Sequence, residues 1–562
     1  MQKVWNVKKY DDEYVQKVCD RYNVSKLLAK LLISRNIAFD DMDMFLNGTI
    51  NDFRDPFDIK DMDKFVERID IALKNNEKIA IFGDYDVDGI TSIIVLYRFL
   101  KELGLTVYYY LPDRLVDGYG LNKEAIEDMC KKDVAVCITV DCGITAVDEV
   151  KYANEFGIDM CITDHHECPE ILPDAYCIVD LKQKDDNSKF KLFAGVGVAF
   201  KCICALSKKY NMPREKYLKY LDLVALGTIS DIVSLTDENR IIAKYGLMLL
   251  NTTKNVGLKA LFKVINQKQI DSITVSYLIA PRINACGRMG DAGIAVRLLL
   301  EKNPIKAYKL AQKIEQYNIQ RQNIEKEILD QALEYINKNN LESKNSIVIY
   351  DKAWHSGVIG IVASRLVNIY SKPVILFTQE DNILRGSGRC PQGFSIYNAL
   401  THCSDYIIQF GGHDLAAGLS VSVDMIDNFK QKFEETVTTT TKGPIPQVID
   451  IDDVIEKKDL NINNIKDIYK LKPYGQENPV PVFEYKNLKI KSLRTIKDNK
   501  HLVFTLWDSN NLINAVAFSM GNRRDEISMA DTIDIVCQID INTYTRPRTI
   551  QLLIQDFKKI VN

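Results

Sequence analysis

The sequence lacks several features that mark particular classes of protein. No apolar run reaches the roughly 18 residues that a membrane-spanning helix needs, and the N-terminus has no apolar core of the signal-peptide type. Net charge is only −3, from 73 basic and 76 acidic residues, so any nucleic-acid binding must come from a local basic groove. The 13 cysteines include no Cys-x-x-Cys pair, which disfavours a zinc site and favours buried thiols in a reducing cytoplasm.

The predicted secondary structure changes near residue 78, from a helical pattern to alternating strands and helices. Residues 1–75 have a mostly helical pattern to which no chemistry is assigned. Beyond them, apolar runs without alternation are joined by helical segments, which predicts a parallel sheet covered on both faces over residues 76–300. The expected strands are Lys78–Phe82, Val107–Leu111, Val134–Val140, Asp159–Thr163 and Tyr176–Val179.

The second half of the chain predicts three further units. Residues 301–343 contain one long helix with apolar residues at helical spacing. Residues 344–442 again alternate strand and helix, which indicates a smaller α/β domain. Residues 446–562 contain five or six short strands, which suits a small barrel such as an OB-fold.

The most informative segment is the acidic loop Gly83–Gly89, between a predicted strand and a predicted helix. Asp84, Asp86 and Asp88 stand at alternate positions, and their mutual repulsion is relieved by a cation with oxygen ligands. The alternatives are a calcium loop or a solvated turn, but the distal glutamate of a calcium loop is missing. Metal-dependent catalysis is the favoured interpretation.

Further polar residues follow the next strands. Asp141 ends one apolar run, and Asp164-His165-His166 ends the following one. Groups at the carboxyl ends of parallel strands converge on one crevice, although Asp141 alone would suit a helix cap and the histidines a surface pair. Asp180 is interpreted as a cap. Asp231, after an apolar helical run, would by itself favour a cap over a ligand.

Histidine is scarce, with six residues in the chain. His165 and His166 follow a strand-end acid, and His355 and His413 lie in glycine-rich segments. His402 and His501 are expected at the surface. A protein with few histidines that places four of them in such positions favours a chemical use for them.

Taken together, Asp86-Val87-Asp88, Asp141, Asp164-His165-His166 and Asp231 resemble motifs I to IV of the DHH phosphoesterases. The resemblance implies that Asp86, Asp88, Asp141, His165 and Asp231 bind two divalent cations, Mn²⁺ or Mg²⁺, with Asp141 shared between them. His166 would face the phosphate, and Asp164 would orient a histidine. Many members have a histidine where this chain has Phe82, so the first cation is held more weakly here or Asp84 also takes part.

Four later segments resemble the RecJ family within that superfamily: Pro281–Met289, Trp354–Leu366, Gly386–Arg389 and Phe410–Gly418. The implied fold class is α/β, with a parallel-sheet DHH domain joined by the long helix to a DHHA1 domain and followed by the barrel. Gly386–Arg389 offers amides, a hydroxyl and a guanidinium that suit a terminal phosphate, although tight turns and a surface ion pair would also explain it. Arg288 and His355 are expected to act on the non-bridging oxygens. The expected substrate-binding residues are Arg114, Tyr119, Asn284, Arg365, Ser387, Arg389, Gly411, Gly412 and His413.

The barrel favours a polymeric substrate, because OB-folds bind single strands by basic grooves and stacking. Phe504, Trp507, Tyr544 and Arg546 are candidates, with core packing or simple exposure as alternatives. The function implied by the resemblance is a monomeric, cytoplasmic exonuclease that digests single-stranded DNA from the 5′ end in repair and recombination. Single-strand-binding protein and a helicase are family expectations as partners. A short-RNA or cyclic-dinucleotide phosphodiesterase and a non-catalytic DNA-binding scaffold are the alternatives.

Overall fold

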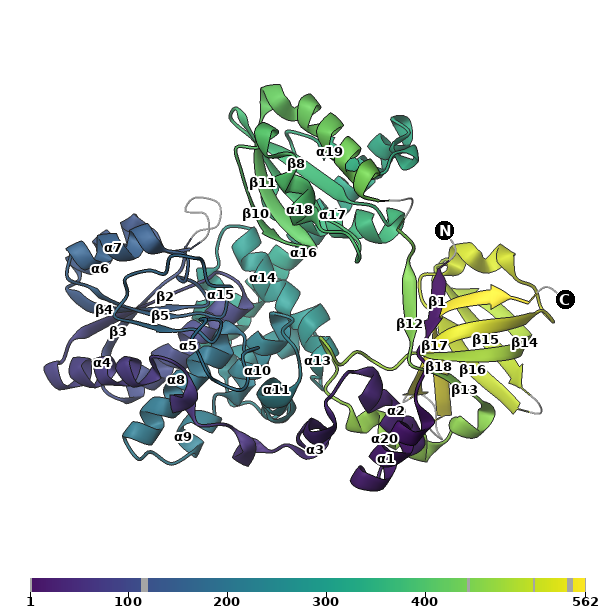
Figure 1. The fold of residues 1–562 in the computed structure, drawn as a ribbon, viewed down its shortest axis with the longest axis horizontal. Coiled ribbons are helices and arrows are strands. Elements are labelled where there is room, and N and C mark those ends of the chain that lie inside the picture. The colour runs from purple at the N-terminus through teal and green to yellow at the C-terminus, as the bar shows by residue number, and fades with distance from the viewer. Residues whose placement is uncertain (1–2, 113–119, 442–444, 509–510, 543–548, 561–562) are drawn as a thin grey trace.

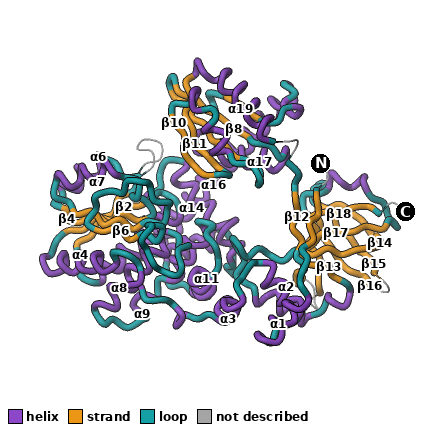
Figure 2. Tube along the Cα trace, in the orientation of Figure 1, coloured by secondary structure: helices purple, strands orange, loops and turns teal. Residues whose placement is uncertain are grey.

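Three large sheets organise the chain, and they stand well apart in Figure 2. The computed structural model describes residues 3–112, 120–441, 445–508, 511–542 and 549–560. In Figure 1 the first sheet and its helices lie at the left, the second at the top and the C-terminal barrel at the right, next to the N-terminus. Within the described residues no helix has the length and apolar character needed to cross a membrane.

The first sheet is wholly parallel, with strand order β3-β2-β4-β5-β6. Its strands are β2 (Lys78–Gly83), β3 (Thr106–Tyr110), β4 (Val134–Val140), β5 (Asp159–Thr163) and β6 (Cys177–Val179). The predicted strands are therefore confirmed to within two residues. The almost continuous burial of β2 and β4 explains why their sequences show no alternation.

Helices cover both faces of this sheet. One face packs in a core with α4 (Met62–Asn75), α5 (Val87–Glu102), α8 (Gly195–Lys209) and α10 (Leu221–Ser230). The other packs against α6 (Lys123–Lys131) and α7 (Val147–Glu155). The remaining helices of this lobe are α9 (Glu215–Leu218), α11 (Asp237–Leu250), α12 (Val256–Val264), α13 (Ser272–Thr274), a π-helical turn (Val275–Ile279), α14 (Ala280–Arg288) and α15 (Gly293–Leu300).

The long helix α16 (Pro304–Lys338) joins this lobe to the second one. Asn303 caps its start with hydrogen bonds to the amides of Ile305 and Lys306. Its first turns bury Ala307 and Ala311 in the core of the first lobe, and its last turns bury residues in the core of the second. One continuous helix thus belongs to both cores.

The second lobe is a five-stranded mixed sheet in the order β10-β11-β9-β8-β7. Its strands are β7 (Ile347–Tyr350), β8 (Val374–Glu380), β9 (Ile383–Arg389), β10 (Gln409–His413) and β11 (Ala416–Ser422). Its helices are α17 (Ser356–Tyr370), α18 (Ile396–Thr401) and α19 (Ile426–Thr440). Strand β10 is an edge strand, whereas β9 has a neighbour on each side.

The C-terminal strands form a closed barrel, because β14 pairs with both β15 and β17. The barrel strands are β14 (Phe483–Ile496), β15 (His501–Asp508), β16 (Asn511–Ala517), β17 (Thr532–Asn542) and β18 (Thr549–Lys559). The short strand β13 (Asp453–Ile455) and helix α20 (Ile462–Lys470) precede it. The expectation that His501 lies at the surface is wrong, since it is buried and accepts a hydrogen bond from the Ser519 amide.

The first 75 residues divide between two cores. Strand β1 (Val4–Val7) pairs with β12 (Val448–Ile451) just before the barrel. Helices α1 (Asp12–Tyr22), α2 (Lys26–Ser34) and α3 (Met42–Asn47) contribute to the barrel core, whereas α4 belongs to the first lobe.

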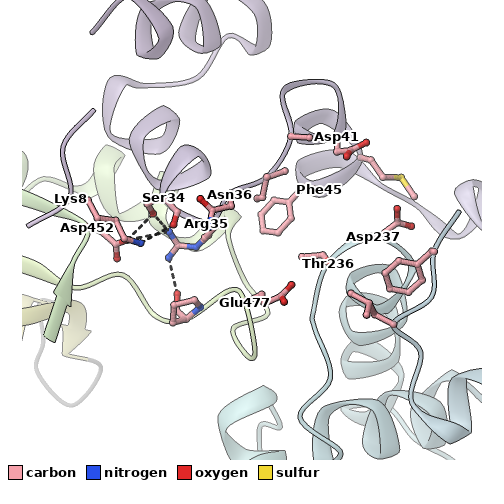
Figure 3. A pocket seen from close by; sticks show the side chains of 16 residues that line it. Lys8, Ser34, Arg35, Asn36, Asp41, Phe45, Thr236, Asp237, Asp452 and Glu477 are labelled. Carbon is pink, nitrogen blue, oxygen red and sulfur yellow. Dashed lines mark hydrogen bonds and ion pairs between the residues drawn. The ribbon is translucent and has the colours of Figure 1, made fainter. Parts of the chain in front are cut away.

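A cavity of about 580 Å³ lies where these N-terminal helices, the start of α11 and the barrel domain meet (Figure 3). Arg35, at the end of α2, lines this cavity and donates to the Asn478 side chain and the Pro479 carbonyl. Arg240 of α11 is buried nearby and donates to carbonyls of α3 and of the segment that ends α20. The Arg240 bonds fix the first lobe to α3 and to the barrel domain, whereas the Arg35 bonds join α2 to the segment before β14.

Candidate active site

The acidic loop between β2 and α5 is fixed by hydrogen bonds to its own carboxylates. Asp86 caps α5, accepting from the amides of Asp88 at 2.8 Å and Gly89 at 3.1 Å. The Asp88 carboxylate accepts from the amides of Gly195 at 2.6 Å and Val196 at 2.9 Å, at the start of α8. The loop is therefore held at the carboxyl edge of the sheet.

The next strands bring further ligands to the same edge. Asp141 follows β4 and His165 lies just beyond β5, while Asp231 follows α10. The Nε2 atom of His165 lies 3.0 Å from Asp141 Oδ1, 3.7 Å from Asp231 Oδ2 and 3.9 Å from Asp88 Oδ2. Residues that are distant along the sequence thus converge on one small volume.

Two groups of metal-type ligands can be distinguished within that volume. Asp84, Asp86 and Asp141 form one, and Asp88, His165 and Asp231 form the other. In each group the ligand atoms lie within 4.8 Å of one another. Asp141 also groups with His165 and His166, so its carboxylate lies between the two sets.

Burial and mutual repulsion dominate the electrostatics of these acids. Burial, followed by the charge of Asp88, raises the pKa of Asp141 well above its ordinary value. Burial and then neighbouring acids likewise raise the pKa of Asp231 to about 9 and that of Asp88 to about 7. Burial lowers the pKa of His165 to about 4, which keeps its imidazole neutral. Clustered carboxylate oxygens and a neutral imidazole are a donor set that fits divalent cations.

Asp164 organises the histidine segment without joining the ligand groups. Its Oδ2 accepts from the Ile144 amide at 3.0 Å, and its Oδ1 lies 2.7 Å from His166 Nδ1. Burial opposes a charge on His166, but the hydrogen bond and charge of Asp164 outweigh it and raise the pKa of His166 to about 9. A charged His166 suits contact with a phosphate.

Two glycines allow this close packing, and neither was predicted from the sequence. A Cβ on Gly195 would lie 2.6 Å from the Asp141 Cβ, and one on Gly227 would lie 2.3 Å from Thr91 Oγ1. The available signal was the position of each glycine in an apolar helical run beside a polar motif. The backbone is also unusual here, since Asp141 has φ +58° and Ile232 has φ +60°.

The predicted residues at the interface of the two lobes contact motifs on both sides. Asn284 of α14 accepts from the Val87 amide at 3.1 Å, which ties α14 to the acidic loop. Arg288 donates to the Gly357 carbonyl at 2.9 Å, at the start of α17. His355 caps α17 through Nδ1, which accepts from the Gly357 amide.

Ser387 and Arg389 lie on β9, with side chains in contact at 3.1 Å. A Cβ on Gly360 of α17 would come within 2.7 Å of Ser387 Oγ, so this helix packs closely against the pair. The expectation that Gly386–Arg389 offers backbone amides to a phosphate is wrong, and so is the alternative that its glycines form tight turns. Strand β9 pairs on both sides, so these amides belong to the sheet, and only the side chains remain to bind a phosphate.

The remaining predicted substrate residues are placed differently. Gly411, Gly412 and His413 are exposed on the edge strand β10. His413 helps to lower the pKa of Glu167, after the larger effect of the Lys182 hydrogen bond, so β10 faces the loop that follows His166. Arg365 forms an ion pair of 2.5 Å with buried Glu325 of α16. Arg114 and Tyr119 lie outside the described residues.

Comparison with known proteins assigns the chain to a family. Residues 78–228 match the DHH family, N-terminal domain, residues 343–439 the DHHA1 domain and residues 451–556 the RecJ OB domain. The single-stranded-DNA-specific exonuclease RecJ of Bacillus subtilis is 36% identical over 561 residues, covering 98% of this chain and 70% of that protein. The Haemophilus influenzae protein of that name is 33% identical over 538 residues, covering 92% and 93%. The chain belongs to the RecJ family.

Solved RecJ structures share the fold. The crystal structure of RecJ in complex with Mn²⁺ from Thermus thermophilus superposes with a TM-score of 0.86 at 26% identity, covering 100% of this chain and 80% of that one. A structure of exonuclease RecJ bound to manganese gives a TM-score of 0.60 at 33% identity, covering 67% and 94%. The expected fold class, with its DHH, DHHA1 and barrel components, is confirmed.

The structure also bears on two expectations from the sequence, the effect of Phe82 on the metal site and the stacking residues of the barrel. Phe82 is buried in the core on the α6 and α7 face of the sheet, whereas Asp84 lies in a ligand group with Asp86 and Asp141. In the barrel, Phe504 is fully buried and is core, which excludes it as a stacking residue. Trp507 is half-buried with Lys491 Nζ 4.8 Å from its ring centroid, and Tyr544 and Arg546 lie outside the described residues.

Proposed function

We propose that this chain is an exonuclease specific for single-stranded DNA that hydrolyses phosphodiester bonds with two divalent cations and works from the 5′ end. The observation that carries the proposal is the convergence of Asp84, Asp86 and Asp141 with Asp88, His165 and Asp231. The relatives named single-stranded-DNA-specific exonuclease RecJ support the substrate class. The Mn²⁺ and Mg²⁺ complexes of Thermus thermophilus RecJ support the cations.

The two ligand groups would hold one cation each, with Asp141 contributing to both. When bound, such ions lower the pKa of a water molecule and stabilise charge that develops on the reacting phosphate. His166, kept protonated by Asp164, would donate to a non-bridging phosphate oxygen. Asp164 acts through the two histidines that it positions.

The second lobe would position the strand. Arg288 and His355, at the contact of α14 with α17, would add donors to the phosphate. Ser387 and Arg389 would bind the leading 5′ phosphate through side-chain donors alone, because their amides are engaged in the sheet.

Other groups would line the path of the strand. The path would include Gly411, Gly412 and His413, together with Asn284, Arg365, Arg114 and Tyr119. We retain residues 76–300, 301–343, 344–442 and 446–562 as the DHH domain, connecting helix, DHHA1 domain and barrel domain, preceded by the N-terminal region 1–75.

We also propose a cytoplasmic monomer that acts in repair and recombination beside a single-strand-binding protein and a helicase. All 13 cysteines are free and most are buried, which suits a reducing compartment.

The decisive experiment replaces Asp141 by Asn, which tolerates the positive φ of this position. With 5′-end-labelled single-stranded DNA and Mn²⁺ or Mg²⁺, we expect kcat/KM to fall at least about a thousandfold, or about 4 kcal/mol of transition-state stabilisation. Chelator should abolish the activity of the unmodified protein.

Asp159→Asn is the matched control. This acid begins β5, at the opposite edge of the sheet, and pairs with Arg68, so its loss should leave the rate per folded molecule unchanged. The proposal fails if Asp141→Asn retains activity. It also fails if a dinucleotide is hydrolysed in preference to the longer strand, which would indicate a dinucleotide phosphodiesterase.

A further inference from the structure

An open groove lies on the first lobe between the edge strand β3 and the start of α16. Its volume is about 660 Å³, and none of the metal-type ligands lines it. Four of its lining residues are cations, namely Arg297, Lys302, Lys306 and Lys309, and Glu301 is the one acid among them. The name "lysine groove" is used below for this surface.

The charge of the lysine groove is opposite to that of the whole chain. Its lining carries a net charge of +3, four cations less one acid, whereas the complete sequence carries −3. Within the described residues no ion pair involves Lys302, Lys306 or Lys309. The Glu301 carboxylate is engaged by the backbone amides of Lys302 and Asn303.

The helix itself places these lysines together. Lys306 and Lys309 are three residues apart, and such positions are neighbours on the surface of a helix. Ala307 and Ala311 are buried on the opposite face, which leaves the lysine face to solvent. Like charges at this spacing repel each other by a few tenths of a kcal/mol. A polyanion would turn that repulsion into attraction.

An aromatic residue, Tyr109 of β3, lines the groove opposite α16. Tyr109 of β3 meets Tyr97 of α5 edge to face, with ring centroids 5.7 Å apart, and Lys101 Nζ lies 5.7 Å from the Tyr97 centroid. An aromatic ring across a groove from several cations is a combination that suits the binding of a single strand.

The groove is also close to the catalytic edge in the topology of the sheet. Tyr109 pairs with Ile81 on β2, two residues before Gly83, where the acidic loop begins. At the other end, Arg297 is held by Asp291, three residues beyond Arg288. The groove is therefore connected to the predicted catalytic site through β2 on one side and through the segment after α14 on the other.

We propose that the lysine groove binds the phosphate backbone of single-stranded DNA beyond the nucleotides held at the catalytic site. The inference rests on the proposed function and adds a second contact region for the same substrate. Flexible ammonium groups without fixed partners suit a backbone that is recognised by charge and not by sequence.

The test replaces Lys302, Lys306 and Lys309 together by Gln. The readouts are kcat/KM on a short 5′-phosphorylated strand and on a long one, in Mn²⁺ at several salt concentrations. For the long strand we expect the slope of log kcat/KM against log salt to become shallower by about 2, at about 0.7 per lost phosphate contact. For the short strand we expect kcat and kcat/KM to be unchanged.

Two control variants distinguish the effect of positive charge in the lysine groove from the effect of positive charge elsewhere on the chain. Lys302→Arg, Lys306→Arg and Lys309→Arg in one protein retain the charge and should keep the salt dependence of the unmodified chain. Lys326, Lys338 and Lys344, exposed beyond the groove, provide the control for lysine number, and their replacement by Gln should change the slope by less than the groove variant. Equal effects of the two Gln variants, or an equal loss on short and long strands, would refute the inference.

A binding measurement distinguishes failure of this inference from failure of the proposed function. Fluorescence anisotropy with a long phosphorothioate strand in Mg²⁺ reports binding without turnover. Weaker binding of the groove variant, in a protein that hydrolyses no DNA, would support the groove and refute the nuclease. If the unmodified protein hydrolyses DNA but the groove variant binds the strand as tightly as it does, the nuclease is supported and the groove is refuted. Weaker binding of the groove variant to duplex DNA alone would refute the single-strand assignment.

Discussion

At the carboxyl edge of the first sheet, the predicted metal ligands follow strands β2, β4 and β5 or the helix α10, and five of the six are acids that are buried or half-buried. In the second lobe, the predicted phosphate-binding groups stand on the strands β9 and β10 themselves, and they are side chains at or near the surface. The first arrangement has the unusual backbone, with φ +58° at Asp141 and φ +60° at Ile232. The second consists of antiparallel ladders whose positive φ falls at a glycine, Gly412 on β10 (φ +140°).

This difference follows from the side chains in each region, which are clustered carboxylates in the first and arginine and serine in the second. A cluster of buried carboxylates destabilises the protein unless cations are bound, so it needs amides such as those of Gly195 and Val196 to hold it in place. Ser387 and Arg389 on β9 are half-buried, and Arg389 already donates to the Ser387 hydroxyl and the Gly388 carbonyl, so its charge has protein partners before any phosphate binds. The first region should therefore respond to substitution through metal affinity, and the second through substrate affinity.

Asp164→Asn is expected to have the largest effect in a comparison of the two regions, and the effect should be on metal affinity. Asp164 contacts His166 and the Ile144 amide, and loss of such an orienting partner lowers metal affinity by about 10- to 100-fold. The Mn²⁺ concentration for half-maximal nuclease activity should rise by that factor, while KM for DNA at saturating Mn²⁺ should change little.

Asp186→Asn is the matched control for this substitution. Asp186 is also buried and accepts amide hydrogen bonds, from Lys60 and Ser188, but it is in neither ligand group. It should lower stability without moving the Mn²⁺ dependence. A Mn²⁺ dependence that is unchanged in Asp164→Asn would show that the histidines are positioned by other contacts.

A smaller effect, on substrate affinity and not on metal affinity, is expected from Arg389→Gln. Loss of a charge-assisted contact to the 5′ phosphate should lower kcat/KM about tenfold, or about 1.4 kcal/mol, on 5′-phosphorylated strands. Strands with a 5′ hydroxyl should be affected far less, and the Mn²⁺ dependence should not move.

Arg385→Gln tests the same strand without the same role, because Arg385 lies on β9 and pairs with Glu380 at 2.8 Å. It should leave the preference for a 5′ phosphate intact. If Arg389→Gln reduces activity equally on strands with a 5′ phosphate and a 5′ hydroxyl, Arg389 does not bind the 5′ phosphate.

The same two regions explain how far the sequence could be interpreted. The strands of the first sheet and the convergence of Asp86, Asp141 and His165 were predictable, because parallel strands carry their end residues to one edge whatever helices intervene. Asp231 follows helix α10 and entered the ligand set only through the resemblance to the DHH phosphoesterases. The packing of Gly195 against Asp141 was not, because a glycine in an apolar run gives no sign of what lies across from it.

In the second lobe, glycines misled the prediction. Gly386 and Gly388 were consistent with a turn, but they lie in β9, where Gly388 admits the Ile396 side chain. The pairing of Arg365 with Glu325 and the burial of His501 depend on partners distant in sequence. The same holds for the division of residues 1–75 between two cores.

The smallest effect concerns the strained backbone of the first region. Ile232 follows Asp231, has φ +60° and is 65% exposed, and a β-branched residue in the left-handed region costs about 1–2 kcal/mol. Ile232→Asn should therefore stabilise the fold by about 1 kcal/mol in denaturant titrations, since Asn tolerates this conformation. Ile273→Asn, at an exposed helical position, should destabilise slightly because Asn is the poorer helix former. If both substitutions destabilise, the Ile232 side chain makes contacts that outweigh its strain, and the strained backbone is then a consequence of packing around Asp231 and not an independent feature of the metal edge.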